Sequence, residues 1–329
     1  MTDARSTEPP LLEVENLTVD VPGAEGPVRI IDDVSFSMQA GTTTGLIGES
    51  GSGKTMTAMA VLGLLPPGST TGGRIRFRGR DLLTMNEDER RKVRGREISM
   101  IFQDPLAALN PTQRIGKQVG EILRANGSSR TEAQRTAVAL LDRAGIPDPA
   151  ARANDYPHQF SGGMRQRAMV ALALAGTPQL ILADEPTTAL DVTVQARILD
   201  LLRSLRDNEG TAMLLVSHDL RVMAHVADHL VVMYAGRVAE RGPARELLRR
   251  PRHPYTRALV RSVPSVSAKS AIADPLPGAP ANPRARPTGC AFHPRCPMAR
   301  DICRDVDPTL IEVGPGRRSA CHFAEEVPV

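Results

Sequence analysis

The sequence contains no tryptophan, and its other aromatic residues are scarce: six phenylalanines and three tyrosines make up 3% of the chain. Proteins that bind single-stranded nucleic acid rely on aromatic faces on which bases stack. A large excess of one charge is also missing, because 41 Lys and Arg residues oppose 37 Asp and Glu residues. These two shortages argue against nucleic acid as a partner.

Long apolar runs are absent as well. No stretch approaches the roughly 20 apolar residues that a membrane-spanning helix needs, and the most apolar stretch, residues 168–175, has the length of a buried helix segment. The first ten residues, MTDARSTEPP, lack the basic and apolar regions of a signal peptide. We therefore expect a cytosolic chain that associates with a membrane only through a partner.

Cysteine is missing from the first 289 residues, and all four cysteines follow: Cys290, Cys296, Cys303 and Cys321. In a reducing compartment such a cluster indicates metal binding before it indicates disulfides. Four thiolates suit a [4Fe–4S] cluster or a structural Zn²⁺ ion. The absence of C-x2-C pairs counts against the common zinc ribbons. Reduced thiols packed without a metal are the remaining alternative.

The chain does have the composition of a soluble globular protein, with 41% hydrophobic and 24% charged residues, and its 329 residues suggest about two domains. Alternating apolar and polar residues predict antiparallel strands at 11–21 and 28–38. A short buried strand at 43–47 runs into a glycine-rich loop, and a helix is expected from about 54 to 64. A further strand pair is expected at about 74–78 and 97–102.

Residues 106–160 change in character and predict a helical insertion between two halves of one α/β core. Further elements are expected to complete a largely parallel sheet: a long helix after Gly163, a strand at 179–183, a helix at 193–206, and strands at 211–216 and 229–234. Six prolines mark residues 264–287 as a linker. The remaining residues, 288–329, are too few to bury a core without a metal, so we expect a C-terminal metal-binding region.

The segment Gly48–Thr55, GESGSGKT, fits the phosphate-loop pattern G-x-x-x-x-G-K-[ST] between a strand and a helix. Its glycines let the backbone curl so that successive N–H groups point at phosphate oxygens. Lys54 then reaches the β- and γ-phosphates, and the Thr55 hydroxyl coordinates Mg²⁺. The alternative is a glycine-rich turn that happens to precede Lys-Thr.

The run Leu180–Glu185 is an apolar strand that delivers two carboxylates at its C-terminal end. Parallel sheets place their ligands at this end of the strands. Asp184 suits a role in holding Mg²⁺, and Glu185 is positioned to orient and polarise the attacking water. Standing alone, the two acids could also cap the following turn.

The segment Phe160–Arg167, FSGGMRQR, resembles the signature motif of ATP-binding-cassette (ABC) ATPases. Ser161 suits a helix cap, and Gly162 and Gly163 leave backbone N–H groups open to a γ-phosphate. The resemblance implies that this phosphate is bound to the opposite subunit of a dimer. Three further positions resemble family elements in the same order: Gln103 the Q-loop, residues 189–191 ending in Asp191 the D-loop, and His218 the switch histidine.

The resemblance covers about residues 11–325. It implies an α/β P-loop NTPase fold, the ABC cassette, with a RecA-like core, an antiparallel β subdomain and a helical subdomain, and so a nucleotide-binding domain at 11–263. The residues that it implies for nucleotide binding are Gly48, Ser50, Gly51, Ser52, Gly53, Lys54, Thr55, Met56, Gln103, Ser161, Gly162, Gly163, Asp184 and Asp191. It implies Glu185, His218 and Lys54 as the catalytic residues, and Thr55, Gln103 and Asp184 around Mg²⁺.

One family element is missing. Such cassettes usually stack adenine on an aromatic residue near the end of the first strand, where this sequence has Val19-Asp20-Val21. Base contact is therefore expected to be weaker or aliphatic, with less selectivity for ATP over GTP.

Several other stretches resemble the ATPase subunits of dipeptide and oligopeptide importers and of related nickel importers. They are residues 101–105 (IFQDP), 109–111 (LNP), 156–159 (YPHQ), 186–195 (PTTALDVTVQ) and 253–256 (HPYT). The four-cysteine tail resembles the D-type of the two paired ATPases, which favours a [4Fe–4S] cluster over zinc.

The resemblance implies a transport ATPase at the cytoplasmic face of the membrane. Its expected partners are a second, homologous ATPase subunit, two transmembrane permease subunits and, indirectly, an extracellular substrate-binding protein. Nickel or another small solute is the alternative cargo. A non-transport cassette acting in translation or DNA repair is the alternative from another class, and it is disfavoured because the chain has a single phosphate loop and a short insertion.

Overall fold

The computed structural model describes residues 9–187, 191–262 and 278–328. The chain forms two compact units. Unit 1 comprises Met1–Thr84 and Val216–Val329, and unit 2 comprises Met85–Leu215. The candidate residues are divided between them, so each unit is described in turn.

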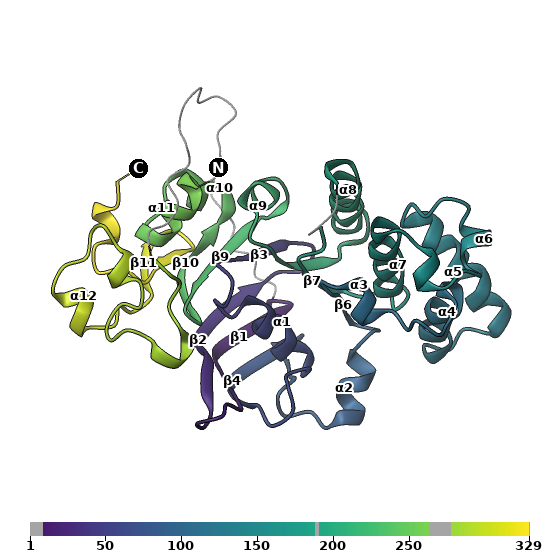
Figure 1. The fold of residues 1–329 in the computed structure, drawn as a ribbon, viewed down its shortest axis with the longest axis horizontal. Helices are drawn as coiled ribbons and strands as arrows, with labels where there is room; N and C mark the ends of the chain where they lie inside the picture. The colour runs from purple at the N-terminus through teal and green to yellow at the C-terminus, as the bar shows by residue number, and fades with distance from the viewer. Residues whose placement is uncertain (1–8, 188–190, 263–277, 329) are drawn as a thin grey trace. The chain divides into compact units, whose positions relative to one another are not determined.

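The first sheet of unit 1 is antiparallel, with the strand order β2-β1-β4-β5 (Figure 1). Its strands are β1 (Leu12–Val21), β2 (Val28–Met38), β4 (Thr70–Phe77) and β5 (Arg80–Asp81). The alternation of apolar and polar residues places one face of β1 and β2 in the core, where Leu12, Leu17 and Ile31 are fully buried. The two predicted N-terminal strands and their antiparallel pairing are confirmed.

The second sheet of unit 1 contains β3 (Thr43–Ile47), which pairs in parallel with β9 (His229–Tyr234). Next to β9, β10 (Arg237–Pro243) pairs in the antiparallel direction, and β12 (Arg317–Ser319) and β11 (Ile311–Gly314) continue this edge. The sequence did not predict β10 or the two strands beyond it. Through β12, the C-terminal region adds directly to the sheet that contains β3.

The helices of unit 1 are α1 (Lys54–Leu62), α9 (Leu220–Val226), α10 (Ala244–Arg249), α11 (Pro254–Arg261) and α12 (Ile302–Asp305), with 3₁₀ turns η2 (Pro283–Ala285), η3 (His293–Arg295) and η4 (Ala324–Glu326). The predicted helix after the glycine-rich loop is α1. It ends at Gly63, which takes up the left-handed conformation and donates its N–H to the carbonyl of Ala60. This glycine precedes the Pro66-Pro67 pair.

Unit 2 has the strand order β8-β7-β6, where β6 (Ile98–Ile101) and β7 (Leu180–Asp184) are parallel and β8 is Ala212–Val216. Its helices are α2 (Glu87–Val93), α3 (Pro105–Ala108), α4 (Ile115–Ala125), α5 (Arg130–Arg143), α6 (Pro149–Arg152), α7 (Gly162–Leu174) and α8 (Val192–Glu209), with η1 at Pro157–Gln159. Helices α4, α5 and α7 lie together in Figure 1 around a core that includes Val119, Leu141 and Ala168. The predicted helical insertion is therefore present.

One predicted strand pairing is wrong. Strands at 74–78 and 97–102 do form, as β4 and β6, but they belong to different units and pair with β1 and β7 respectively. Neighbouring strands in a sequence often pair, which is why the pairing was expected. Here β4 instead hydrogen-bonds to β1, and the apolar strand β6 takes a parallel neighbour in which all five residues are buried.

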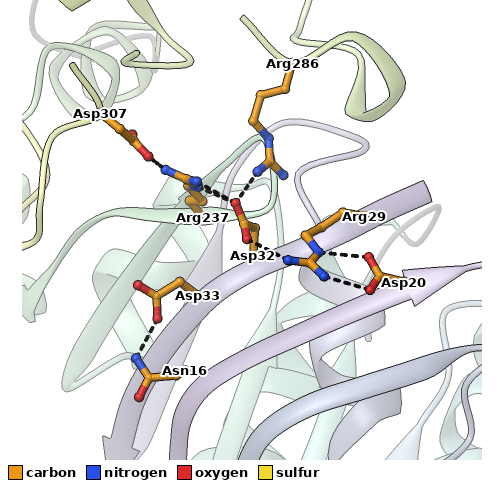
Figure 2. A network of polar contacts seen from close by, with 8 residues as sticks. All are labelled: Asn16, Asp20, Arg29, Asp32, Asp33, Arg237, Arg286 and Asp307. Carbon is orange, nitrogen blue, oxygen red and sulfur yellow. Dashed lines mark hydrogen bonds and ion pairs between the residues drawn. The ribbon is translucent and has the colours of Figure 1, made fainter. Parts of the chain in front are cut away.

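The C-terminal region is also attached to unit 1 through charged side chains (Figure 2). The Asp32 carboxylate on β2 accepts hydrogen bonds from Arg237 on β10 at 2.7 Å and from Arg286 after η2 at 2.5 Å. Arg237 also pairs with Asp307. Burial disfavours the Asp32 carboxylate, but the two arginines outweigh it and hold the pKa of Asp32 below its ordinary value.

Among the residues that the structure describes, no helix has both the length and the apolar character needed to cross a membrane.

Candidate functional site

The predicted phosphate loop lies between β3, which ends at Ile47, and α1, which begins at Lys54. The N-cap of α1 is Gly53, with φ 100°, so no side chain caps the first turn. The N–H groups at a helix start have no partners within the helix and carry its positive dipole end. The positive end of the α1 dipole therefore lies where an anionic phosphate group would bind.

Gly48 is required by a close backbone approach. Its φ is 154°, and a Cβ atom there would lie 2.2 Å from the carbonyl oxygen of Met233 on β9. No side chain fits in that space, so the first position of the motif can only be glycine. Strand β9 thereby sets the path of the loop.

Lys54 is buried, and its ammonium group donates hydrogen bonds to the carbonyl oxygens of Gly48 at 2.8 Å and Glu49 at 2.9 Å. The ammonium group is thus held inside the curl of the loop. The remaining candidates of the loop and of the start of α1 differ in exposure: Ser50 and Gly51 are exposed, Ser52 is buried, and Thr55 and Met56 are half-buried. The structure brings these predicted residues together as one loop.

The switch-histidine candidate, His218, is exposed just after β8. It lines a cavity of about 360 Å³ together with Gly48 and Glu49 of the loop and Arg295 of the C-terminal region. His218 and the phosphate loop are therefore neighbours, as the resemblance implies.

The other candidates lie in unit 2. Asp184 ends β7 and is buried, and Glu185 follows it with φ 45°, a left-handed conformation that is costly for a residue other than glycine. Glu185 Oε2 accepts a hydrogen bond of 3.1 Å from Gln103 Nε2, which lies just after β6. This hydrogen bond joins two predicted site residues, Gln103 and Glu185, that are 82 positions apart in the chain.

The signature segment begins α7. The Ser161 hydroxyl caps the helix by accepting the N–H of Met164 at 3.3 Å, as predicted. A Cβ atom at Gly162 would meet nothing within 4 Å, so this side of the helix start is open. Asp191 caps α8 by accepting the N–H of Val194 at 2.9 Å. Residues 188–190, which include the rest of the D-loop candidate, lie outside the described residues.

The stretch Val19-Asp20-Val21 forms the end of β1. Asp20 is engaged there by Arg29 of β2, whose guanidinium donates two hydrogen bonds of 2.8 and 2.9 Å to the carboxylate (Figure 2). These hydrogen bonds lower the pKa of Asp20. No aromatic side chain is present in this stretch, and weaker or aliphatic base contact stays a prediction.

The predicted iron–sulfur or zinc site is wrong. Within 9–187, 191–262 and 278–328, no group of three or more His, Cys, Asp or Glu side chains is arranged to hold a metal ion. The cysteines carry free thiols that line a cavity of only about 20 Å³, room for about one water molecule.

Spacing alone misled the prediction, because the positions of cysteines along the chain do not fix how their side chains are arranged in space. Burial raises the pKa of the Cys296 and Cys321 thiols to about 11, and it raises that of Cys290 as well. Reduced thiols packed without a metal, the remaining alternative, stays a prediction.

The sequence did not predict two residues that contact the phosphate loop at Glu49. The Glu49 N–H donates to the Tyr255 hydroxyl at 2.8 Å, and the Glu49 carboxylate accepts two hydrogen bonds from Arg295. Tyr255 lies in the HPYT stretch that resembles the importer ATPases, but nothing in that stretch indicates a contact 206 residues away.

Two protein-family models match this chain. A family model described as "ABC transporter" matches residues 31–188, and one described as "Oligopeptide/dipeptide transporter, C-terminal region" matches residues 239–303. The dipeptide transport ATP-binding protein DppD of Escherichia coli is 44% identical over 315 residues, covering 95% of this chain and 96% of the relative. This chain belongs to the ABC transporter ATPase family. The resemblance found in the sequence is thereby confirmed.

Two further relatives are similar to this ATPase. The oligopeptide transport ATP-binding protein OppD of Salmonella typhimurium is 46% identical over 312 residues, covering 94% of this chain and 93% of the relative. Among solved structures, the dimeric ATP-binding cassette MJ0796 bound to ADP and phosphate is 27% identical, with a TM-score of 0.65 over 71% of this chain and 98% of that one. The fold is therefore the ABC cassette.

Proposed function

We propose that this ATPase hydrolyses ATP to drive the import of dipeptides or oligopeptides through partner permease subunits. The observation that carries the proposal is the near full-length similarity to relatives named for dipeptide and oligopeptide transport, at 44% and 46% identity. The match to the oligopeptide/dipeptide transporter C-terminal region supports the same branch. Related nickel importers share the resemblance, so nickel is the second candidate cargo.

In this proposal the loop residues Gly48–Thr55 bind the phosphates of ATP. Lys54, now held by two loop carbonyls, would turn its ammonium group toward the β- and γ-phosphate oxygens. The dipole of α1, which is positive at the start of the helix, adds to this attraction. Selectivity for adenine is expected to be modest, because the end of β1 offers no aromatic residue.

Thr55, Gln103 and Asp184 are the candidate ligands of Mg²⁺. Their side chains offer hydroxyl, amide and carboxylate oxygens, which are the donors that Mg²⁺ prefers. The bound ion supplies charge neutralisation to the phosphates. The donor chemistry of these residues supports the assignment.

Glu185 and Gln103 carry the hydrolytic step in this proposal. The hydrogen bond from Gln103 orients the Glu185 carboxylate, and this carboxylate would polarise the attacking water molecule. The strained backbone of Glu185 is typical of residues whose orientation is set by function. His218, beside the phosphate loop, is the candidate contact to the γ-phosphate.

Ser161, Gly162, Gly163 and Asp191 are assigned to the ATP bound by a second cassette. The open side of α7 at Gly162 is suited to approach a phosphate of another subunit. The similar cassette MJ0796 is a dimer. We infer that the partner here is a second, homologous ATPase subunit, and that both work at the cytoplasmic face of a membrane with two permease subunits and an extracellular substrate-binding protein.

The inferred domain organisation accompanies these roles. Residues 11–263 form the nucleotide-binding domain, with a helical subdomain at about 106–160, followed by a linker at 264–287 and a C-terminal region at 288–329. Residues 263–277 of this plan lie outside the described residues.

Uptake in cells tests the proposal. Wild type and Glu185→Gln, both at native level, are compared for uptake of labelled dipeptides, labelled oligopeptides and nickel. Loss of peptide uptake alone supports the proposal, and loss of nickel uptake alone moves the ATPase to the nickel importers. Unchanged uptake of all three contradicts the importer role.

A further inference from the structure

The C-terminal region reaches back to the second residue of the phosphate loop. Arg295, in η3, donates hydrogen bonds from its two terminal nitrogens to the two carboxylate oxygens of Glu49, at 2.6 and 3.0 Å. Only 5% of the Arg295 side chain is exposed. A two-point contact of this kind fixes the orientation of the carboxylate as well as its position.

The guanidinium group is itself held in place. Its central carbon lies 5.9 Å from the ring centres of both Tyr234 and Phe292. The Arg295 Cγ atom lies so close to Gly278 that a Cβ atom added to this glycine would be only 3.4 Å away. The Glu49 carboxylate raises the pKa of Arg295 further above its usual value. Arg295 is therefore a fixed positive charge on a rigid support.

Glu49 in turn connects this support to the group that meets the phosphates. Its carbonyl accepts the Lys54 ammonium group at 2.9 Å and the Ser52 N–H at 3.2 Å. Its own N–H donates to the Tyr255 hydroxyl at 2.8 Å. Burial raises the pKa of that hydroxyl, so it stays neutral. The side chain, the N–H and the carbonyl of Glu49 each have a different partner.

We propose that Arg295 is a positioning residue of the phosphate loop, through which the C-terminal region sets the affinity of this ATPase for ATP. The inference rests on the proposed nucleotide site and adds the control of that site by residues outside the cassette motifs. Arg295 also neutralises the carboxylate of Glu49, which otherwise stands next to the place where phosphates bind.

The alternative is a merely structural ion pair that keeps the C-terminal region folded. The two roles differ in their kinetics. A loop held in its binding conformation contributes to the affinity for ATP in the ground state and the transition state alike, so its loss raises KM and leaves kcat unchanged. Loss of a merely structural pair reduces the amount of active protein, and therefore the apparent kcat, at unchanged KM.

The test measures the dissociation constant of ATP with Mg²⁺, and the KM and kcat of ATP hydrolysis, on the full-length chain. Arg295→Gln is expected to raise the dissociation constant and KM about tenfold, within the range found for residues that act through others, with kcat within about twofold. Arg295→Lys is expected to recover part of the affinity, because it restores the charge and not the two-point contact. Arg300→Gln is the matched control, since Arg300 is in the same region and pairs with the half-exposed Glu326.

Glu49→Gln separates positioning from charge. Loss of a negative charge alone would tighten ATP binding, whereas loss of the fixed loop weakens it. We expect weaker binding, by about the same factor as in Arg295→Gln, and a double variant no weaker than either single variant. Tighter or unchanged ATP binding in Glu49→Gln overturns the proposal. If Arg295→Gln does not fold, the ATP affinity of Glu49→Gln alone decides whether the proposal stands.

Two other results have distinct meanings. A fall in kcat with unchanged KM and dissociation constant in Arg295→Gln shows a structural role and overturns the proposal. Failure of the wild-type chain to bind ATP overturns the proposed function itself, and the positioning role with it.

Discussion

Gln103 Nε2 donates a hydrogen bond of 3.1 Å to Glu185 Oε2. The contact joins the residue that follows β6 to the residue that follows β7, and the parallel pairing of these two strands brings their C-terminal ends to one edge of the sheet. Glu185 adopts φ 45° there, a left-handed backbone conformation, directly after the last residue of β7. One carboxylate oxygen is thus oriented by an amide before any substrate is bound.

Glu185→Gln should therefore abolish ATP hydrolysis and preserve ATP binding. The amide keeps the shape and the oxygen that accepts from Gln103, but it cannot act as a base toward water. We expect ATPase activity to fall by at least about a hundredfold, as is typical for loss of a general base, with the dissociation constant of ATP unchanged within about twofold. Steady-state phosphate release and equilibrium ATP binding measure the two effects.

Glu132→Gln is the control for this variant, because Glu132 is an exposed acid in the first turn of α5 in the same unit. It should retain wild-type activity. If Glu185→Gln kept half of the wild-type turnover, Glu185 would have no part in the chemistry.

The sequence was sufficient for the parts of the site that are contiguous in the chain. The phosphate loop, the two acids at the end of β7 and the signature segment each fit within eight residues, and their geometry depends on local backbone rules such as the glycine at 48 and the cap at Ser161. The helix α1, the helical insertion, α7, α8 and most strands were predicted for the same reason, since their periodicity is local. The sequence did not predict α2 or the helices from α9 to α12.

Contacts between distant segments were not predictable in this way. Arg295 and Glu49 are 246 residues apart, and neither residue stands in a pattern that indicates the other. Strand β12 was missed because its three residues are too few to show an alternating pattern, and its pairing with β10 joins segments far apart in the chain. The cysteines misled for a related reason: their spacing does not fix how their side chains are arranged in space.

Lys54→Ala should weaken ATP binding without unfolding the chain. The variant removes the charged donor that now bonds to the carbonyls of Gly48 and Glu49. Hydrogen bonds to charged groups contribute roughly 1.5–3 kcal/mol, so the dissociation constant of ATP should rise about 10- to 150-fold. Calorimetric titration with Mg²⁺ and ATP measures it.

Lys92→Ala serves as the comparison, since Lys92 is exposed on α2 and its removal takes away the same charge. Equal weakening in both variants would show a general charge effect and would count against a specific role for Lys54.

His253 should make stability fall as the pH is lowered. It is fully buried, and burial lowers its pKa to about 4, from about 6.5 in an unfolded chain. Its Nδ1 accepts the Tyr255 N–H at the start of α11, which also requires the neutral ring. Below pH 6.5 the unfolded chain takes up a proton that the folded chain does not, so the free energy of unfolding decreases down to about pH 4.

His253→Asn tests this dependence, because asparagine also caps helices and does not titrate. Urea unfolding at pH 7.5, 6.0 and 5.0 should show a wild-type loss of stability over that range that exceeds the variant's by about 1–2 kcal/mol. His229→Asn, at an exposed position on β9, should behave as wild type. Parallel pH profiles for wild type and His253→Asn would contradict the expectation.

Asp32 and Asp307 both form ion pairs with Arg237, but their side chains differ in exposure (Figure 2). Variants of the two residues therefore test which ion pairs hold the C-terminal region in place. The Asp32 side chain is 15% exposed and also bonds Arg286, whereas that of Asp307 is 45% exposed. Breaking a largely buried pair leaves uncompensated charge, so Asp32→Asn should lower the free energy of unfolding by about 2 kcal/mol, somewhat less than for a fully buried pair. Asp307→Asn should cost under about 1 kcal/mol, as exposed pairs do. Urea unfolding at pH 7.5 measures both, and equal losses in the two variants would mean that burial does not govern this network.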